Sequence, residues 1–266
     1  MSVVKLIFKI ISALILLILI FIAGLIIYIQ VTKPAVPDFE QLKSDYAIIH
    51  QADNFEWVTF EEIPPTAFTI LLPEKTDNVF LNSILLESMS SSVCHIFIPY
   101  ETLKGRQSNH IFSPHNLAFS ITKQLKSLYQ LPISPYNPPS SYIQAFHSCT
   151  FTTDLLYQWG ESRVAEAYLN LSFYGQHTYG IHAASRFYFD KFPHQLNKQE
   201  TIIIVALLNS PTISSTHPEK LFQSSCRVLN SLPIPENKKD CDTLKPYLDI
   251  FFEYPARAAQ AQENAS

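Results

Sequence analysis

Glycine is scarce in this chain, which has five glycines among its 266 residues. A phosphate-binding Walker loop and a dinucleotide-binding fingerprint each need closely spaced glycines, so the sequence excludes both. Basic residues are outnumbered as well, with 19 Lys and Arg against 23 Asp and Glu. This balance argues against nucleic acid as a partner. Metal-ligand spacing is also missing, because His177 and His182 have no third ligand near them in sequence.

A long apolar run lies near the start of the chain. No residue from Ile10 to Ile29 is charged, and a helix of this length can cross a bilayer. Lys5 and Lys9 precede the run, as they would in a cleaved signal peptide, but the apolar core of a signal peptide would be shorter. We therefore predict a retained anchor. Because only Lys33 follows closely behind the span, the amino terminus is expected in the cytoplasm and the rest of the chain on the periplasmic side of the inner membrane.

The pattern of composition divides the chain into five segments. Few stretches alternate between apolar and polar residues, so the largest segment is predicted to be mainly α-helical. The segments are a cytoplasmic amino terminus (1–9), a transmembrane anchor (10–30), a proline-containing linker (31–40), one folded domain (41–254) and a flexible tail rich in Ala and Gln (255–266).

Several helix starts can be located from capping residues. The prolines at 64 and 65 suit the first turn of a helix. Residues 113–129 begin with Ser-Pro, which predicts an N-cap followed by proline at the first helical position. Residues 197–200 resemble a capping box, and the apolar run that follows to residue 208 indicates a helix buried in the core. Residues 141–158 are predicted to be helical from a weaker period.

Four cysteines allow disulfides in an exported domain. Cys226 and Cys241 enclose a short loop whose closure would contribute about 3 kcal/mol. Cys94 and Cys149 can form a second pair, although the sequence alone does not fix the connectivity. Four ordinary buried thiols are the alternative interpretation.

The stretch Arg163–Pro211 carries the most specific pattern in the chain. Its ordered elements are Tyr168-Leu169-Asn170, Gly175, Tyr179-Gly180, Ala183-Ala184, Tyr188-Phe189, Lys191, Leu196, Glu200, Ala206-Leu207-Leu208 and Pro211. In order and spacing this stretch resembles the peptidoglycan glycosyltransferases (glycosyltransferase family 51). The resemblance implies a lysozyme-like helical fold for residues 41–254. It also implies that a glycan strand grows from a lipid-linked disaccharide precursor, with undecaprenyl diphosphate as the leaving group.

Two further segments resemble motifs of the same family. Residues 57–72 are similar to the W-x-x-[LF]-x-E-I-P-P segment at the start of the family's domain. When one inserted residue is allowed, this match places Glu74 at the position of the general base. Residues 113–129 are similar to its G-G-S-T-I-T-Q-Q-L motif, with Phe119 in place of the serine, where it should obstruct close approach of a phosphate to the backbone. The substrate-binding candidates implied by this match are Ser120, Thr122, Lys123, Gln124 and Lys126.

A third family motif, R-K-x-x-E, falls on residues 144–148 when counted back from Glu166. Gln144, Ala145 and Ser148 stand at its three charged positions. The reaction needs a carboxylate to accept a proton and cations to neutralise the departing diphosphate. Glu166 itself is interpreted as a surface or capping residue and not as the catalytic acid.

Two functions therefore stay open. The chain is either a working monofunctional glycosyltransferase or a catalytically impaired homologue that binds the precursor or acts as a scaffold for cell-wall synthesis proteins. A lysozyme-like hydrolase would need two carboxylates flanking a sugar, and only Glu74 qualifies by position. The family motifs indicate no certain cofactor. A divalent cation beside the diphosphate is compatible with the reaction that they imply.

Overall fold

The computed structural model describes residues 2–32, 34–49, 55–72, 114–131, 142–235 and 239–263. Within these residues the regular structure is helical, and the one β-type pairing is an isolated antiparallel bridge between Phe173 and Tyr179. The mainly α fold, a helical domain behind one amino-terminal helix, is thereby confirmed. The elements are α1 (Ser2–Thr32), α2 (Phe39–Ile49), α3 (Pro65–Leu71), α6 (Pro114–Tyr129), α7 (Tyr142–Leu171), α8 (Gly180–Phe189), η2 (Pro193–Gln195), α9 (Lys198–Leu207), α10 (Pro211–Ser214), α11 (Pro218–Ser231), η4 (Cys241–Leu244) and α12 (Lys245–Glu263).

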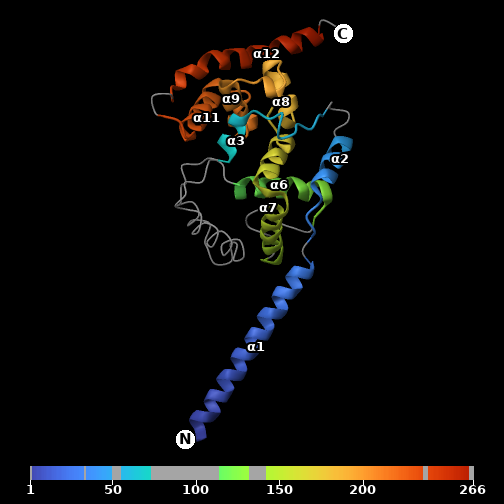
Figure 1. Cartoon of the computed structure of the whole chain (residues 1–266), viewed down its shortest axis with the longest axis vertical. Coiled ribbons are helices and arrows are strands. Elements are labelled where there is room, and N and C mark those ends of the chain that lie inside the picture. Colours follow the sequence, from blue (N-terminus) through green and yellow to red (C-terminus); the bar gives the residue numbers. More distant parts are fainter. Residues whose placement is uncertain are drawn as a thin grey trace.

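Helix α1 projects from the domain as a single rod and places the amino terminus at the far end of the molecule (Figure 1). Its segment Ile7–Leu25 is long and apolar enough to cross a membrane. The large apolar side chains described along this segment are exposed, Leu16 and Leu17 among them. A helix that is apolar all round and covered by no protein is suited to lipid. The helix is longer at both ends than the predicted span of 10–30.

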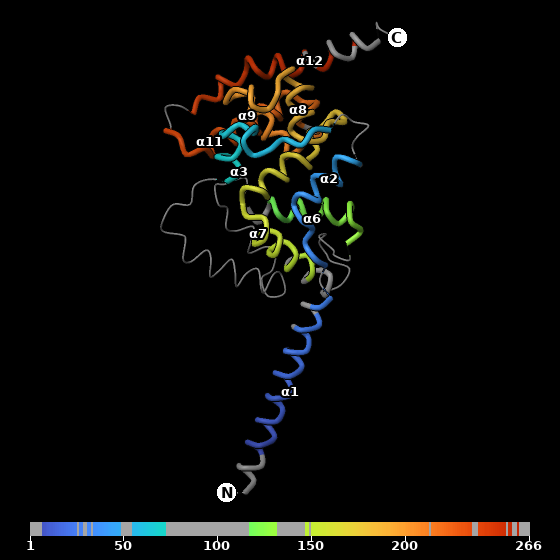
Figure 2. Tube along the Cα trace, turned by 45° about the vertical axis from the view of Figure 1, so that its right-hand side comes forward, coloured from blue at the N-terminus to red at the C-terminus, as the bar shows by residue number. Residues whose placement is uncertain are grey.

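Helix α9 forms the centre of the domain. Every residue from Ile202 to Leu207 has no exposed surface, as an apolar run without a polar face predicts. The helix packs against α3, α8, α11 and α12, which surround it in Figures 1 and 2. Its start is the predicted capping box: the Asn197 side chain accepts a hydrogen bond from the Glu200 amide, and the Glu200 side chain accepts one from the Asn197 amide.

Helices α6 and α7 form the part of the described domain nearest to α1 (Figure 1). Helix α7 is interrupted at Gly160, whose φ of 75° and ψ of 166° are not helical. Its first half packs against α6, while its second half leads into α8. Helix α6 begins at Pro114 and ends at Tyr129, in agreement with the predicted element.

The carboxyl-terminal part of the domain differs from expectation in one respect. Helix α12 continues through Pro255 to Glu263, so the segment predicted as a flexible tail is helical over most of its length. The residues after Pro255 are mainly Ala, Gln, Arg and Glu, which are strong helix formers and extend the helix despite the proline. A disulfide joins Cys226 on α11 to Cys241 on η4, as the sequence allowed. Cys94 lies outside the described residues.

Candidate functional site

Thr122, one of the five candidate residues on α6, lies inside the interface with α7. It is fully buried, and its hydroxyl donates a 2.8 Å hydrogen bond to the carbonyl of Ala118. The same oxygen lies 3.0 Å from the hydroxyl oxygen of Thr152 on α7. Thr152 in turn donates a hydrogen bond to the carbonyl of Ser148. Thr122 therefore connects two helices and is covered by protein in this structure.

The other four candidates are nearer to solvent. Lys123 is exposed, and its ammonium lies 5.0 Å from the centroid of the Phe119 ring. Ser120, Gln124 and Lys126 are half-buried. The side-chain oxygen of Gln124 is buried and has no hydrogen-bond partner among the described residues. A buried amide oxygen without a donor is uncommon in folded proteins.

The first half of α7 meets the end of the anchor at His147. This side chain is buried, and its Nε2 lies 3.1 Å from Oγ1 of Thr32, the last residue of α1. Ser148, which stands at the position of the family's second glutamate, is 2% exposed. The last two residues of the segment that resembles the charged family motif are therefore buried, and one of them, His147, contacts the end of the anchor.

Glu74, the candidate general base, lies outside the described residues. The preceding chain is described as far as Leu72, and two hydrogen bonds fix it at Val58. Asn170 on α7 accepts a hydrogen bond from the Val58 amide and donates one to the Val58 carbonyl, both at 2.8 Å. Asn170 has no exposed surface. The sequence had indicated Asn170 only as part of the family pattern, whereas the structure shows it pairing with backbone.

Glu166 corrects an expectation. It was interpreted as a surface or capping residue, but only 5% of it is exposed. Its Oε1 accepts a 2.7 Å hydrogen bond from the Trp57 indole and lies 3.4 Å from the Lys43 ammonium. The apolar surroundings on α7 could not reveal these partners, which lie more than a hundred residues away in sequence. These contacts connect α7 to α2 and to the segment before α3, and its exclusion from catalysis stays a prediction.

The aromatic residues of the Arg163–Pro211 stretch are mostly core. Tyr174 and Tyr188 have no exposed surface, and Tyr168 is 9% exposed. The Tyr174 hydroxyl donates to the carbonyl of Leu169, and that of Tyr188 donates to the carbonyl of Tyr174. Tyr179 is the exception, because 44% of it is exposed.

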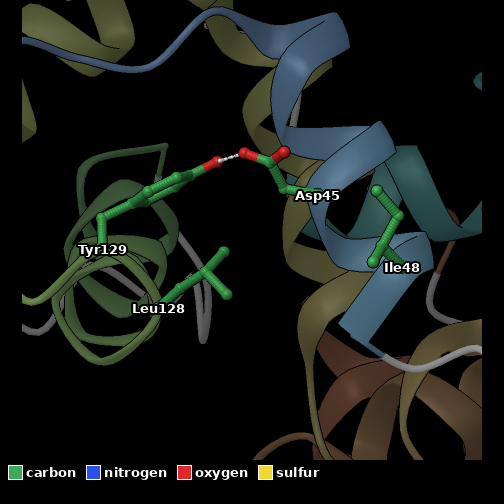
Figure 3. Close-up of a pocket in the computed structure, with 4 residues that line it drawn as sticks. All are labelled: Asp45, Ile48, Leu128 and Tyr129. Carbon is green, nitrogen blue, oxygen red and sulfur yellow. Dashed lines mark hydrogen bonds between the residues drawn. The ribbon is translucent and has the colours of Figure 1, made fainter.

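An open pocket of about 280 Å³ lies between α2 and α6 (Figure 3). Asp45 and Ile48 line it from α2, and Leu128 and Tyr129 line it from α6. The Tyr129 hydroxyl donates a 2.8 Å hydrogen bond to Oδ2 of Asp45 across the pocket. Burial and the adjacent Asp45 carboxylate raise the pKa of Tyr129. The pocket thus has one bonded polar pair between apolar walls.

A second cleft, of about 200 Å³, lies beside α8. Glu56 and Glu62 line one side, and His182, Phe192 and His194 line the other. The Nε2 of His182 lies 3.2 Å from Oε2 of Glu56. Sequence reasoning missed this cleft because its members come from segments more than a hundred residues apart. The sequence had indicated His182 only as a histidine without the further ligands of a metal site.

Comparison with known proteins shows which proteins the chain resembles. Residues 116–233 match the family described as Transglycosylase. The chain is 36% identical over 64 residues to the biosynthetic peptidoglycan transglycosylase of Haemophilus influenzae strain PittEE, covering 24% of this chain and 27% of the relative. It is 23% identical over 214 residues to the protein of the same name from Mannheimia succiniciproducens, covering 75% of each. It is 39% identical over 61 residues to penicillin-binding protein 1A of Mycolicibacterium smegmatis, covering 23% of this chain and 8% of the relative.

Residues 116–233 are therefore similar to a transglycosylase domain, and the chain is similar over most of its length to a biosynthetic peptidoglycan transglycosylase. The matched region begins downstream of Glu74 and includes α7, α8 and α9 in full.

Proposed function

We propose that this protein is a membrane-anchored peptidoglycan glycosyltransferase that extends glycan strands from a lipid-linked disaccharide precursor. The observation that carries the proposal is the contact between Thr32 and His147. It places α6 and α7 at the end of the apolar helix. A lipid-linked diphosphate has its headgroup at the membrane surface, which is the level at which such a helix ends.

The reaction forms one bond and breaks one. The 4-hydroxyl oxygen of one disaccharide attacks the anomeric carbon of another, and the bond from that carbon to the diphosphate oxygen breaks. Glu74 accepts the hydroxyl proton, as a general base must within hydrogen-bond reach. Lys123 and Lys126 supply positive charge for the departing diphosphate. Ser120 and Gln124 offer polar groups for the sugar, while Thr122 positions α6 against α7.

The test is polymerisation of purified lipid-linked precursor by the full-length protein in membrane vesicles. The wild type should form polymer, and Glu74→Gln should lower the rate about 100-fold or more. Glu61→Gln is the matched control, because Glu61 is an exposed carboxylate on the same approach to α3. No polymer from the wild type would exclude the enzyme, whereas an unchanged rate in Glu74→Gln would exclude only this base.

The lysines can be tested separately. Lys123→Met and Lys126→Met remove charge while keeping an extended side chain, and each should slow polymerisation about tenfold if it faces the diphosphate. Lys198→Met is the control, since Lys198 is an exposed lysine at the start of α9. Equal rates for all three variants would remove the two α6 lysines from the mechanism.

A catalytically impaired precursor-binding protein is the second candidate. One observation favours it: the motif positions of the cations and second carboxylate carry Gln144, Ala145 and Ser148. The comparisons give this alternative no support. It predicts that the wild type and Glu74→Gln bind the precursor equally and that neither forms polymer. Polymer from the wild type would rule it out.

A further inference from the structure

The linker between the anchor and the domain is attached to α7 at both of its ends. At the membrane end, Nε2 of His147 lies 3.1 Å from Oγ1 of Thr32, the last residue of α1. At the domain end, the Trp159 indole donates a 3.1 Å hydrogen bond to the carbonyl of Pro37. His147 is 6% exposed and Trp159 is 7% exposed, so the surrounding protein holds both side chains in place.

A second hydrogen bond decides the direction of the contact at Thr32. The Thr32 hydroxyl donates its one hydrogen to the carbonyl of Tyr28, at 2.8 Å. Its oxygen therefore accepts from His147, whose Nε2 carries a proton. A neutral imidazole satisfies this arrangement, so the contact does not require a charged histidine.

The linker also packs against the domain between its two attachments. Val36 is half-buried and lies against the hydrophobic core, and residues 34–38 contain no helix or turn. Directly after them, Phe39 begins α2 with an exposure of 3%. Its ring meets the Trp159 ring edge-on, at a centroid distance of 5.1 Å. The domain end of the linker is thereby fixed to the core.

The length of the linker matches the part of α7 that it follows. Positions 147 and 159 lie about 18 Å apart along the helix axis, because α7 is helical between them and rises about 1.5 Å per residue. A fully extended chain covers about 17 Å between residues 32 and 37, at about 3.4 Å per residue. The linker therefore has little slack. It passes the first half of α7 on its way from α1 to α2 (Figures 1 and 2).

We propose that residues 34–37 form a taut strap, which holds the domain at one height and in one orientation above the membrane. The inference rests on the proposed function, because a fixed orientation matters to a site whose substrate is held in the same bilayer. Thr32 and His147 are then positioning residues, which act through the placement of the domain. A domain that is already oriented loses less entropy on reaching a membrane-embedded headgroup, and so binds it more tightly at the same chemical rate.

Proteolysis of the full-length protein in vesicles tests the strap without an enzyme assay. Proteinase K should cut residues 34–38 slowly in the wild type, because cleavage requires the attached backbone to open locally. Thr32→Val keeps the shape of the side chain but removes the acceptor. It should release the domain about fivefold faster, as expected for the loss of one hydrogen bond. Thr32→Ser keeps the hydroxyl and should match the wild type.

The second attachment is tested in the same way. Trp159→Phe removes the indole N–H but keeps an aromatic ring beside Phe39. The double variant with Thr32→Val should release the domain faster than either single variant, because both ends of the strap are then detached. Circular dichroism checks folding. If Trp159→Phe fails to fold, the two Thr32 variants decide the test, since Thr32 is exposed and lies outside the domain core.

Polymerisation with two precursors then tests the positioning role. One precursor is embedded in the vesicle membrane by its lipid, and the other carries the same disaccharide diphosphate on a short, water-soluble chain. Thr32→Val should raise KM for the embedded precursor about fivefold and leave its kcat unchanged, because only productive encounter is impaired. Both constants for the soluble precursor should be unchanged. Thr32→Ser should have the wild-type KM with either precursor.

Two results would overturn the proposal. Equal release rates for Thr32→Val and Thr32→Ser would show that the strap is not held by this contact. Equal changes in KM for both precursors would show that Thr32 does not position the domain on the membrane. The proposed function fails by a different result: faster release of Thr32→Val, with no polymer from the wild type, would confirm the strap and exclude the transferase.

Discussion

The indole nitrogen of Trp57 donates a 2.7 Å hydrogen bond to Oε1 of Glu166, and this bond connects the segment before α3 to the second half of α7. Lys43 on α2 reaches the same carboxylate oxygen at 3.4 Å. One buried carboxylate therefore holds two elements that precede α3. The contact therefore fixes α2 and the segment before α3 against α7.

Glu166→Ala should destabilise the domain by about 2–4 kcal/mol, because it leaves the Trp57 indole and the Lys43 ammonium without their shared partner. The measurement is the free energy of unfolding of the detergent-solubilised protein in denaturant. Glu61→Gln should change that free energy by less than about 0.5 kcal/mol, as expected for an exposed carboxylate. An equal effect of both substitutions would show that the buried network contributes nothing.

Local capping signals explain why much of the fold could be predicted. Pro114 begins α6 and Asn197 caps α9, and both effects depend on residues within one helical turn. The apolar run of α9 similarly indicated burial without knowledge of its neighbours. These features depend on adjacent residues, and the family resemblance supplied the expectation of a lysozyme-like helical fold.

The candidate sites depend on contacts distant in sequence, which local patterns do not encode. The burial of Thr122 depends on Thr152 from another helix, and that of Glu166 depends on Trp57. The cleft with Glu56 and His182 likewise joins separate segments. Glu74 lies outside the described residues, so its role stays a prediction.

The disulfide between Cys226 and Cys241 should stabilise the domain by about 3 kcal/mol, since it closes a loop with a sequence separation of 15. Reductant should lower the free energy of unfolding of the wild type by that amount. In the double variant Cys226→Ser with Cys241→Ser, reductant should have a smaller effect, because this bond is already absent. The same response to reductant in both proteins would assign the effect to other cysteines.

Gly175→Ala should be more destabilising than Gly160→Ala. Both glycines have positive φ, at 88° and 75°, so alanine is strained at either position. A Cβ at position 175 would also lie 2.6 Å from the carbonyl oxygen of Pro211, whereas a Cβ at position 160 meets no atom within 4 Å. We expect about 3 kcal/mol or more at 175 and about 1–2 kcal/mol at 160. Thermal unfolding of the two variants compares them, and equal losses would contradict the close packing at Gly175.

Buried tyrosines should make the stability of the domain fall at alkaline pH. Burial raises the pKa of Tyr188 to about 12, and it raises the pKa of Tyr168 to about 12 as well. In the unfolded chain a tyrosine ionises near pH 10. Between about pH 10 and 12 the unfolded state loses protons that the folded state retains, so the free energy of unfolding decreases as pH rises. Below that range the contribution is fully present.

Tyr188→Phe isolates one of these groups. The variant loses the hydrogen bond to the carbonyl of Tyr174, which should lower the free energy of unfolding by about 1 kcal/mol at neutral pH. It should also show a shallower decline above about pH 10, because one fewer buried hydroxyl must ionise on unfolding. Tyr157→Phe is the control, since Tyr157 is 90% exposed and its ring packs in no core. Denaturant unfolding followed from about pH 8 to 11.5 measures both effects. If Tyr188→Phe declined as steeply as the wild type, the buried hydroxyl of Tyr188 would not contribute to the alkaline instability.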